Sequence, residues 1–295
     1  MLKIEKTEVY GWGAAIRGMR NPKNSWERSD SHPCPILGEI TDENRPYRCA
    51  GCKNEFVGRP NCIVIGENDL DLMTRLRNAG PEHAKFLRMV IVTCDITAPL
   101  YWWKEFDTYK VGTVANSCST MHKIMEKPFE IDDFSHEYLA DMSFGIGLMP
   151  EPGDRGVFVD ASPFHDGSIL YSPSGLLQLT IRALNQYRDT YLKIKEKPTK
   201  DISKKNECLK KIWWQVIQLL PSSYNQKRTV FLNYWVLANI YHQRQYHKQD
   251  EWRVTFCDWI KSLPYSNLIT GEELKSIGES YEQSQIDQNE DHLDK

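Results

Sequence analysis

The stretch LLPSSYNQKRTVFLNYWVLANIYHQRQYHKQDEW, from Leu219 to Trp252, is the most informative part of this chain for its fold and its function. It opens on a Leu-Pro step, and the rest is typical of one amphipathic helix with more polar side chains than packing requires. Asn233 and Arg244 are eleven residues apart, about three helical turns, so we expect both on nearly the same face. An arginine among apolar and aromatic side chains needs an anionic or carbonyl partner. The stretch therefore indicates either a nucleotide site or a structural ion pair of Arg244 with an acidic residue.

The length and charge of the chain favour a protein that acts on small molecules. Its 295 residues can bury a large core, and we expect a single domain over residues 1–277. The net charge of −3 makes nucleic acid an unexpected partner. No apolar run approaches the roughly 20 residues that span a bilayer, so we expect a cytoplasmic protein without membrane contact. Residues 278–295 are acidic and polar, which predicts a disordered tail.

Four of the eight cysteines crowd into a predicted insertion at about residues 30–65. Proline, glycine, asparagine and charged residues there oppose a long helix. Cys49 and Cys52 have the CxxC spacing that places two thiolates on one tetrahedral zinc, and Cys34, Cys62 or His32 can complete the site. Three interpretations stay open: a structural zinc, a metal-free loop with unligated thiols, and redox chemistry.

The middle of the chain changes its apolar period several times. MVIVTCDIT, residues 89–97, is β-branched and predicts a strand, and the aromatic LYWWKEFDTYK, residues 100–110, predicts a short helix. The hydroxyl-rich segment of residues 111–123 can cradle a phosphate, or it can form an ordinary turn with a helix N-cap. Residues 176–197 and 204–220 predict two long scaffold helices.

The other cysteines are predicted to be structural. Cys94, Cys208 and Cys257 lie in apolar or amphipathic surroundings, which is typical of small core residues.

Two regions of the chain, read together, resemble the flavin-dependent thymidylate synthase family, which methylates dUMP with a reduced flavin. In the first region, the segment Gly80–His83 before the strand is similar to the family's Ser/Thr-x-x-Glu-His segment, and Ala98-Pro99 matches its Ala-Pro step. Asn116 and Ser119 match the family's Asn-x-x-Ser element. Cys118 lies between them and is expected to be a small pocket residue, because no enzyme cysteine attacks the base in this family.

The second region resembles the family in the order and spacing of its polar residues. Leu220-Pro221 is followed by Asn233, Asn239 and Arg244, as in the family. The resemblance implies an α/β (α+β) fold with a central mixed sheet packed by long helices, and the Cys-rich loop as an insertion. It also implies a homotetramer with active sites between subunits.

The resemblance further implies roles for individual residues. Arg244 would be catalytic, because a guanidinium can stabilise the negative charge that develops on the pyrimidine. The nucleotide-binding residues would be Ser119, Asn116, Lys110 and Glu105. The FAD-binding residues would be Glu82, His83, Asn233 and Asn239. Methylenetetrahydrofolate and NADPH would be the co-substrates.

The chain departs from the family where the family binds phosphate. Thr108 and Lys110 stand at two arginine positions of the signature, and Met121 stands at a third. Each charge-assisted hydrogen bond to phosphate contributes about 1.5–3 kcal/mol, so other cations would have to compensate. The candidates are Lys104, Lys110, Lys123 and Arg228.

Three functions therefore stay open. The first is a divergent flavoenzyme that transfers a one-carbon unit to C5 of a pyrimidine nucleotide, such as dUMP. The second is an inactive nucleotide-binding or regulatory protein of the same fold. The third is a zinc-stapled interaction protein.

Overall fold

The computed structural model describes residues 2–33, 63–119, 123–139 and 172–271. The predicted zinc ligands and the acidic tail lie outside these ranges, so the zinc site, the Cys-rich loop and the disordered tail stay predictions. The cysteines concerned are Cys34, Cys49, Cys52 and Cys62.

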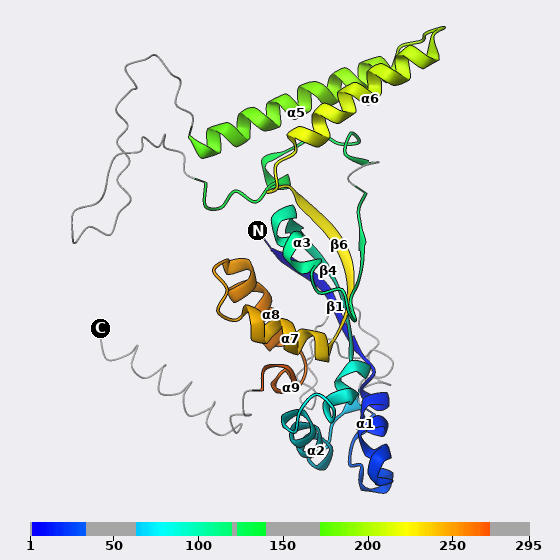
Figure 1. The fold of residues 1–295 in the computed structure, drawn as a ribbon, viewed down its shortest axis with the longest axis vertical. Helices are drawn as coiled ribbons and strands as arrows, with labels where there is room; N and C mark the ends of the chain where they lie inside the picture. The colour runs from blue at the N-terminus through cyan, green and yellow to red at the C-terminus, as the bar shows by residue number, and fades with distance from the viewer. Residues whose placement is uncertain (1, 34–62, 120–122, 140–171, 272–295) are drawn as a thin grey trace, which may run out of the picture. The chain divides into compact units, whose positions relative to one another are not determined.

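The described chain contains both helices and strands, with strands near its start, in its middle and before its last helices (Figure 1). The strands are β1 (Lys3–Tyr10), β2 (His32–Pro33), β3 (Ile63–Val64), β4 (Ile91–Pro99), β5 (Val114–Ser117) and β6 (Asn225–Asn233). The α-helices are α1 (Trp12–Arg20), α2 (Glu67–Asn78), α3 (Leu100–Phe106), α5 (Pro173–Glu196), α6 (Ile202–Leu219), α7 (Tyr234–Arg244), α8 (Cys257–Ser262) and α9 (Asn267–Thr270). The shorter helices are the 3-10 segments η1 (Asn21–Lys23), η2 (Trp26–Arg28), η4 (Ala84–Met89) and η5 (Ile131–Asp133) and the π-helix η6 (Glu251–Phe256).

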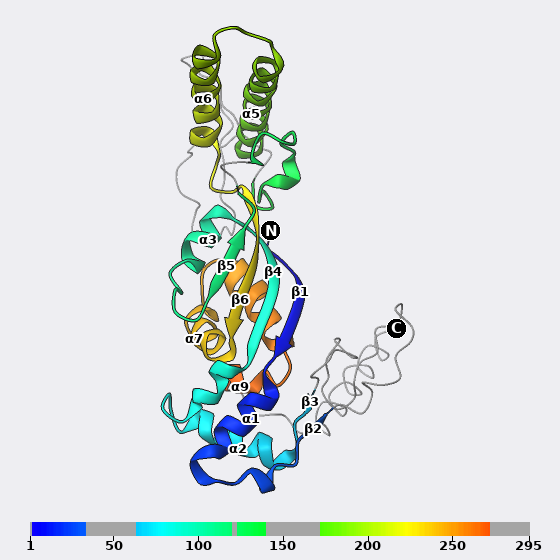
Figure 2. The ribbon, with the colours of Figure 1, turned by 90° about the vertical axis from the view of Figure 1, so that its right-hand side faces the viewer.

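Four strands form one sheet in the order β1-β4-β6-β5. The backbone N–H of Tyr234 donates to the carbonyl of Val90, and that of Leu100 donates to the carbonyl of Tyr224, both at 3.0 Å. These two pairs flank β4 and β6 at opposite ends, so the two strands are antiparallel, as their arrows show in Figure 2. The predicted strand after Met89 and the α/β fold with a central sheet are confirmed, and the antiparallel pairing refines the expected mixed sheet.

The stretch from Leu219 to Trp252 is not one helix, and that prediction is wrong. Strand β6 occupies its first part, α7 begins only at Tyr234, and η6 follows α7. Val230 and Leu232 are buried while the side chain between them is half-buried, which is the two-residue period of a strand. Pairing with β4 supplies the hydrogen bonds that a helix would otherwise make, and this partner is not visible in a local window of sequence.

The chain divides into two compact units. Unit 1 comprises Met1–Lys3, Asp95–Thr108 and Ala115–Thr229. Unit 2 comprises Ile4–Cys94, Tyr109–Val114 and Val230–Lys295. Because the chain passes repeatedly between the units, neither is a continuous piece of sequence, and the single domain of residues 1–277 stays a prediction.

A helical hairpin of α5 and α6 dominates unit 1, which confirms the two predicted scaffold helices (Figures 1 and 2). The hydroxyl of Ser172 accepts from the N–H of Gly175 at the start of α5, and the carboxylate of Asp201 accepts from the N–H of Lys204 at the start of α6. An apolar cluster joins the hairpin to residues 124–134. It is built on Leu177, Leu184 and Val216 of the hairpin and on Ile124, Met125, Phe129 and Phe134. The cluster covers only part of the apolar surface of the two helices. Six large apolar side chains of the hairpin stay exposed: Leu176, Leu179, Tyr187, Ile202, Trp214 and Leu219.

The described cysteines divide by burial. Cys94 and Cys257 are 1 % exposed, which confirms them as core residues. Cys208 is exposed on α6, so its prediction as a core residue is wrong, because it lies on the outer face of an amphipathic helix. No helix in the described part of the chain is both long and apolar enough to cross a membrane.

Candidate functional site

Arg244 lies at the end of α7 among aromatic side chains of unit 2. Its Nε donates to the hydroxyl of Tyr109 at 2.8 Å, and its Cζ lies 4.7 Å from the ring centre of Trp252. The Tyr109 hydroxyl donates in turn to the Oε1 of Gln243 at 3.1 Å. Stacking on the fully buried Trp252 and the hydrogen bond to Tyr109 hold the plane of the guanidinium in one orientation. A half-buried, oriented guanidinium of this kind suits recognition of an anionic or carbonyl group.

Tyr109 and Trp252 are the partners of Arg244 that sequence reasoning did not identify. Tyr109 is 135 positions away from Arg244 in the chain. In the sequence, Tyr109 stands between Thr108 and Lys110, in the segment that resembles the family signature. That position was the one indication of a role for Tyr109, and a tyrosine there does not by itself predict a contact with Arg244.

Asn233 begins α7 and has a structural role that the sequence did not reveal. Its Oδ1 accepts from the N–H of Val236 at 3.0 Å, and the residue is 8 % exposed. Gly112 packs against this cap with a φ of 78°, and a Cβ added there would meet the Asn233 side chain at 3.1 Å and that of Val236 at 2.9 Å. The Oδ1 of Asn233 is therefore occupied as an N-cap, which leaves its amide nitrogen as the group that can bind a cofactor.

We expect Asn233→Ala to lower the free energy of unfolding by about 1 kcal/mol, because it removes the cap of α7. Asn233→Ser keeps a capping oxygen and should recover most of that loss, while both variants lack the amide nitrogen. Urea unfolding followed by tryptophan fluorescence measures the difference. Equal stability of the alanine variant and the wild type would show that the cap does not stabilise α7.

The other predicted flavin-binding residues also lie in unit 2. Glu82 and His83 are exposed in the turn before η4, and Asn239 is exposed on α7. η4 and α7 pack together, and the guanidinium carbon of Arg88 lies 5.5 Å from the ring centre of Trp235. Carboxylate, imidazole and amide groups provide the donors and acceptors that a flavin ring and its side chain need, and Arg88 offers a charge for a diphosphate. The chemistry of these side chains fits a flavin.

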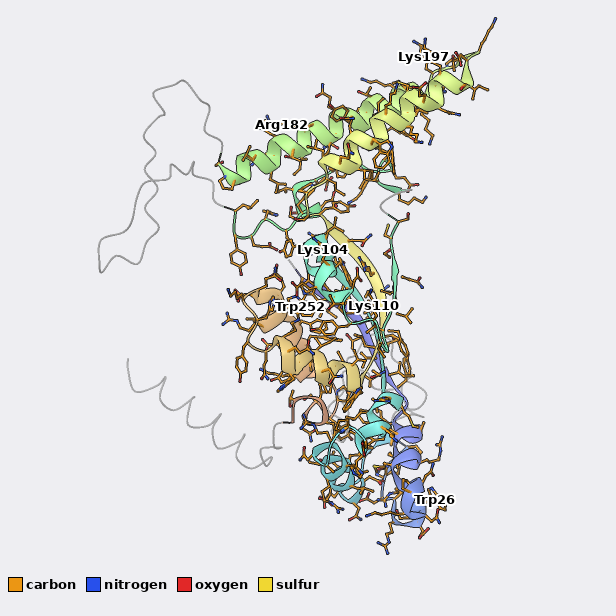
Figure 3. All side chains as sticks on the ribbon, in the orientation of Figure 1. Trp26, Lys104, Lys110, Arg182, Lys197 and Trp252 are labelled. Carbon is orange, nitrogen blue, oxygen red and sulfur yellow. The ribbon has the colours of Figure 1, made fainter. Side chains whose placement is uncertain are left out.

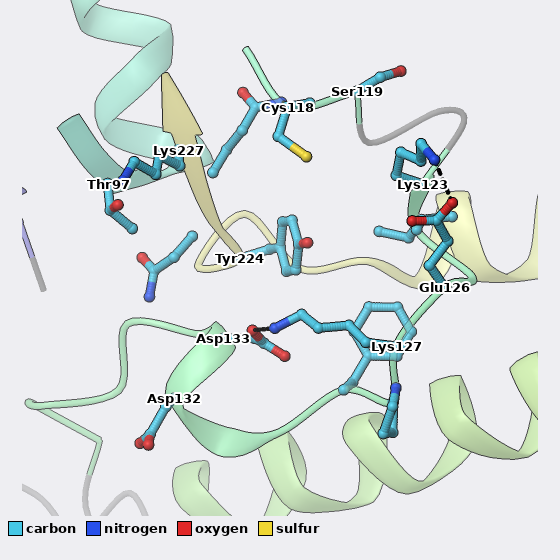
Figure 4. A pocket seen from close by; sticks show the side chains of 15 residues that line it. Thr97, Cys118, Ser119, Lys123, Glu126, Lys127, Asp132, Asp133, Tyr224 and Lys227 are labelled. Carbon is cyan, nitrogen blue, oxygen red and sulfur yellow. Dashed lines mark hydrogen bonds and ion pairs between the residues drawn. The ribbon is translucent and has the colours of Figure 1, made fainter. Parts of the chain in front are cut away.

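In unit 1, a cavity of about 470 Å³ opens where β6 begins (Figure 4). Its walls include Ser119 and Cys118, and the role of Cys118 as a pocket residue of a nucleotide site stays a prediction. Tyr224 and Phe129 provide an aromatic wall, with ring centres 6.3 Å apart. Burial, followed by the negative charge of Asp133, raises the pKa of Tyr224 to about 12, so its hydroxyl is protonated at neutral pH. A cavity of this volume is of the size that holds a small molecule.

The lysines around this cavity are paired with acidic residues. The ammonium of Lys123 contacts Glu126 at 2.5 Å, and that of Lys127 contacts Asp133 (Figure 4). The hydrogen bond from Lys123 to Glu126 raises the pKa of the Lys123 ammonium. A phosphate bound here would have to replace Glu126 as the partner of Lys123, which is feasible because an ion pair exposed to water is weak.

Arg228, another candidate to compensate for missing arginines, has structural partners. Its guanidinium carbon lies 4.2 Å from the ring centre of Trp103, and its Nη1 contacts the carboxylate of Asp107 at 2.7 Å. Its Nε donates to the side chain of Gln226 at 2.9 Å. These contacts commit Arg228 to holding α3 against β6. Lys104 on α3 and Lys110 are exposed and remain available as phosphate ligands (Figure 3).

The predicted nucleotide-binding residues fall in both units. Ser119, Asn116 and Glu105 belong to unit 1, and Lys110 and Arg244 belong to unit 2. Within unit 1, Ser119 lines the cavity, Asn116 is exposed on β5, and Glu105 is half-buried on α3. Their assembly into one nucleotide site stays a prediction.

No metal site is found in the ranges that the structure describes, where no three His, Cys, Asp or Glu side chains are grouped to hold an ion. The four cysteines predicted to bind zinc lie outside those ranges.

Comparison with known proteins gives a clear result for the fold only. No model of a known protein family matches the chain, and no curated protein matches it. Two crystal structures of the flavin-dependent thymidylate synthase ThyX from Helicobacter pylori, both with FAD and dUMP, match with a TM-score of 0.50 each. They are 15% and 16% identical to the chain, cover 91% and 92% of it, and are themselves covered to 98%. A UMP/dUMP methylase, PolB from Streptomyces cacaoi, matches with a TM-score of 0.44 at 12% identity, covering 92% of this chain and 95% of its own.

The match to ThyX takes in almost the whole of both chains, so it extends over the sheet and the helices on either side of it in sequence. The chain therefore has the α/β fold of the flavin-dependent thymidylate synthases.

Proposed function

We propose that this protein is a divergent flavin-dependent enzyme that transfers a one-carbon unit to C5 of a pyrimidine nucleotide, with dUMP as the first substrate to test. The observation that carries this proposal is the similarity in fold, over 91% of the chain, to an enzyme solved with FAD and dUMP. The oriented guanidinium of Arg244 gives it chemical support.

In such a reaction, a new carbon–carbon bond replaces the C5–H bond of the pyrimidine. C5 becomes nucleophilic as negative charge develops on the ring and its carbonyl oxygens. Arg244 would stabilise that charge, and its contacts with Tyr109 and Trp252 keep it oriented before the reaction begins. Preorganisation of this kind matters because a free arginine side chain would have to lose its rotational freedom in the transition state.

The cofactor and co-substrates belong to the same proposal. Glu82, His83, Asn233 and Asn239 would bind FAD, which supplies reducing equivalents when it is in the reduced form. Methylenetetrahydrofolate would supply the one-carbon unit and NADPH would reduce the flavin. The proposal includes a homotetramer with active sites between subunits. The resemblance to the flavin-dependent thymidylate synthase family implies this assembly.

The nucleotide phosphate would be bound differently from the family's pattern. Ser119 and Lys123 lie at the cavity of unit 1, and Lys104 and Lys110 are exposed. Lysines contact phosphate as point charges and lack the two-pronged geometry of arginine, so we propose weaker nucleotide binding than three arginines would provide.

The absorbance spectrum of the purified protein tests this proposal. We expect a flavin band at about 450 nm, either as purified or after FAD is added and the excess removed. Addition of dUMP should change the shape of the band, because the nucleotide binds beside the flavin. With methylenetetrahydrofolate and NADPH, the protein should release tritium from dUMP labelled at C5.

Two other outcomes would count against the enzyme. A spectrum without a flavin band, together with no tritium release, would contradict it. Binding of dUMP in calorimetry without flavin or turnover would favour the inactive nucleotide-binding protein of the same fold.

A further inference from the structure

The tip of the α5–α6 hairpin carries a strong positive charge in a chain that is acidic as a whole. Residues 193–211, which form this tip, contain eight lysines and three acidic residues, a local net charge of +5, whereas the whole chain has a net charge of −3. The eight lysines come from the end of α5, the link and the start of α6. Figure 3 shows Lys197 at the end of the hairpin.

Most of these lysines have no acidic partner among the described residues. Lys211 is paired with Glu207 at 2.7 Å. Lys205 donates to the carbonyls of Lys195 and Lys197, at 2.7 and 2.8 Å. The remaining six are exposed and make no ion pair within the described chain. They are Lys193, Lys195, Lys197, Lys200, Lys204 and Lys210.

The turn that presents these charges is held in a fixed shape. Lys205 binds the last carbonyls of α5, and Asp201 caps α6 through the N–H of Lys204. A hollow of about 280 Å³ lies beside the turn, with Lys197 and Lys204 among its walls. Ammonium groups presented on a rigid turn lose little backbone entropy when they bind phosphates, so the surface is prepared for a ligand with several negative charges.

We propose that the basic tip of the hairpin, residues 193–211, binds the phosphate backbone of a nucleic acid. Clustered lysines on one end of a domain are the electrostatic footprint of such binding, which the net charge of the whole chain concealed. The tip therefore revises the expectation that nucleic acid is not a partner. This binding is separate from the proposed nucleotide chemistry and does not depend on it.

A nucleic acid fits the tip better than a membrane does. A helix that lies on a membrane needs a broad apolar face as well as basic residues. Within residues 193–211, Ile202 is the one large apolar side chain that is exposed, at 66%. The other exposed apolar side chains of the hairpin lie outside the tip: Leu176, Leu179, Tyr187, Trp214 and Leu219. A surface of exposed charge without an apolar face is suited to a phosphate backbone in water.

Fluorescence anisotropy of a fluorescein-labelled DNA duplex of about twenty base pairs, titrated with the full-length protein at about 50 to 200 mM salt, tests the proposal. We expect binding of the wild type that weakens steeply with salt. The variant Lys197→Gln/Lys200→Gln/Lys204→Gln should bind about tenfold more weakly or worse at the lowest salt, and its log–log salt slope should be smaller by about 2 to 3, since each lost phosphate contact removes about 0.9. Lys205 is left unchanged because it holds the turn.

The matched control is Lys23→Gln/Lys248→Gln/Lys261→Gln, which removes the same charge from exposed lysines of unit 2. It should bind DNA with nearly the affinity and salt slope of the wild type. Any small loss of affinity would come from the lower net charge of the protein. Circular dichroism checks that both variants are folded, and the salt slope of the wild type tests the proposal even if one is not. Three outcomes would overturn it: no binding by the wild type at low salt, equal loss in both variants, or binding of vesicles with anionic lipids but not of duplex or single-stranded DNA or RNA.

Discussion

Replacing Arg244 by alanine is expected to lower kcat for one-carbon transfer to dUMP by about 100- to 1,000-fold, the usual effect of removing a preorganised group that stabilises charge in the transition state. The guanidinium is fixed by Tyr109 at 2.8 Å and by Trp252 at 4.7 Å, so no nearby side chain can move into its place without disturbing both contacts. Arg244→Lys keeps the charge but loses the planar group and the stack, and we expect it to restore only part of the activity. Initial rates of tritium release at saturating dUMP measure the effect.

Arg228 offers a matched control for this experiment. It is also an arginine stacked on a tryptophan, with its guanidinium carbon 4.2 Å from the ring centre of Trp103, but Asp107 and Gln226 already occupy it. Arg228→Ala should lower the melting temperature and leave kcat near the wild-type value. If both variants lose stability and neither loses kcat, Arg244 is a packing residue and the proposed catalytic role is wrong.

Replacing Asp69 by alanine is expected to lower the free energy of unfolding by about 3–5 kcal/mol, because it leaves a buried charge without its partner. Asp69 is 0 % exposed, and its carboxylate contacts the Nε of Arg20 at 2.6 Å, with Arg20 itself 4% exposed. The hydroxyls of Ser29 and Ser31 each donate to the same carboxylate at 2.6 Å. This network fixes the segment after η2 against α2, so its loss should be felt across unit 2. Urea unfolding measures the change.

The same helix provides the control. Asp71 on α2 pairs with Arg75 at 2.8 Å, but both side chains are more than 60% exposed. We expect Asp71→Ala to cost no more than about 0.5 kcal/mol, the usual contribution of an exposed pair at this helical spacing. Similar losses in the two variants would contradict a special role for the buried network.

The stabilisation by Asp69 should also depend on pH. Burial alone would raise the pKa of the Asp69 carboxyl, but hydrogen bonds from Ser29, Ser31 and Arg20 outweigh it and lower the pKa below its usual 3.8. The unfolded chain then binds this proton more readily than the folded chain does. The stabilisation is therefore complete at neutral pH and is lost as the pH falls below about 3.8 through the folded pKa, so the urea midpoints of wild type and Asp69→Ala should converge in acid.

Elements with a strong local signal could be predicted from the sequence. The β-branched run that became β4, and the long amphipathic patterns that became α5 and α6, are decided by side chains within a few residues of one another. Strand β6 was missed because its sequence fits a helix locally. Its conformation is set by hydrogen bonding to β4, which is more than 120 residues earlier in the chain.

The candidate site shows the same division. Arg244 and Ser119 are predicted site residues, chosen from the order and spacing of polar residues, which survive in the chain even where individual motifs are altered. The partners that give them their environment, Tyr109 for the guanidinium and Tyr224 for the cavity, could not be identified in this way. They are brought close by the fold and not by the sequence interval between them.

The sequence by itself determined the two scaffold helices, the first central strand, the order of the polar residues that resemble a thymidylate synthase and the loss of its phosphate-binding arginines. The tertiary structure alone decided that residues 225–233 of the most informative stretch form a strand, that the side chain of Asn233 caps a helix, and that lysines of α5, α6 and their link gather at one basic tip. The physical reason is the distance along the chain over which each interaction acts. Helical period and residue type act over a few positions, whereas strand pairing, burial and electrostatic clustering depend on which distant segments the fold places side by side.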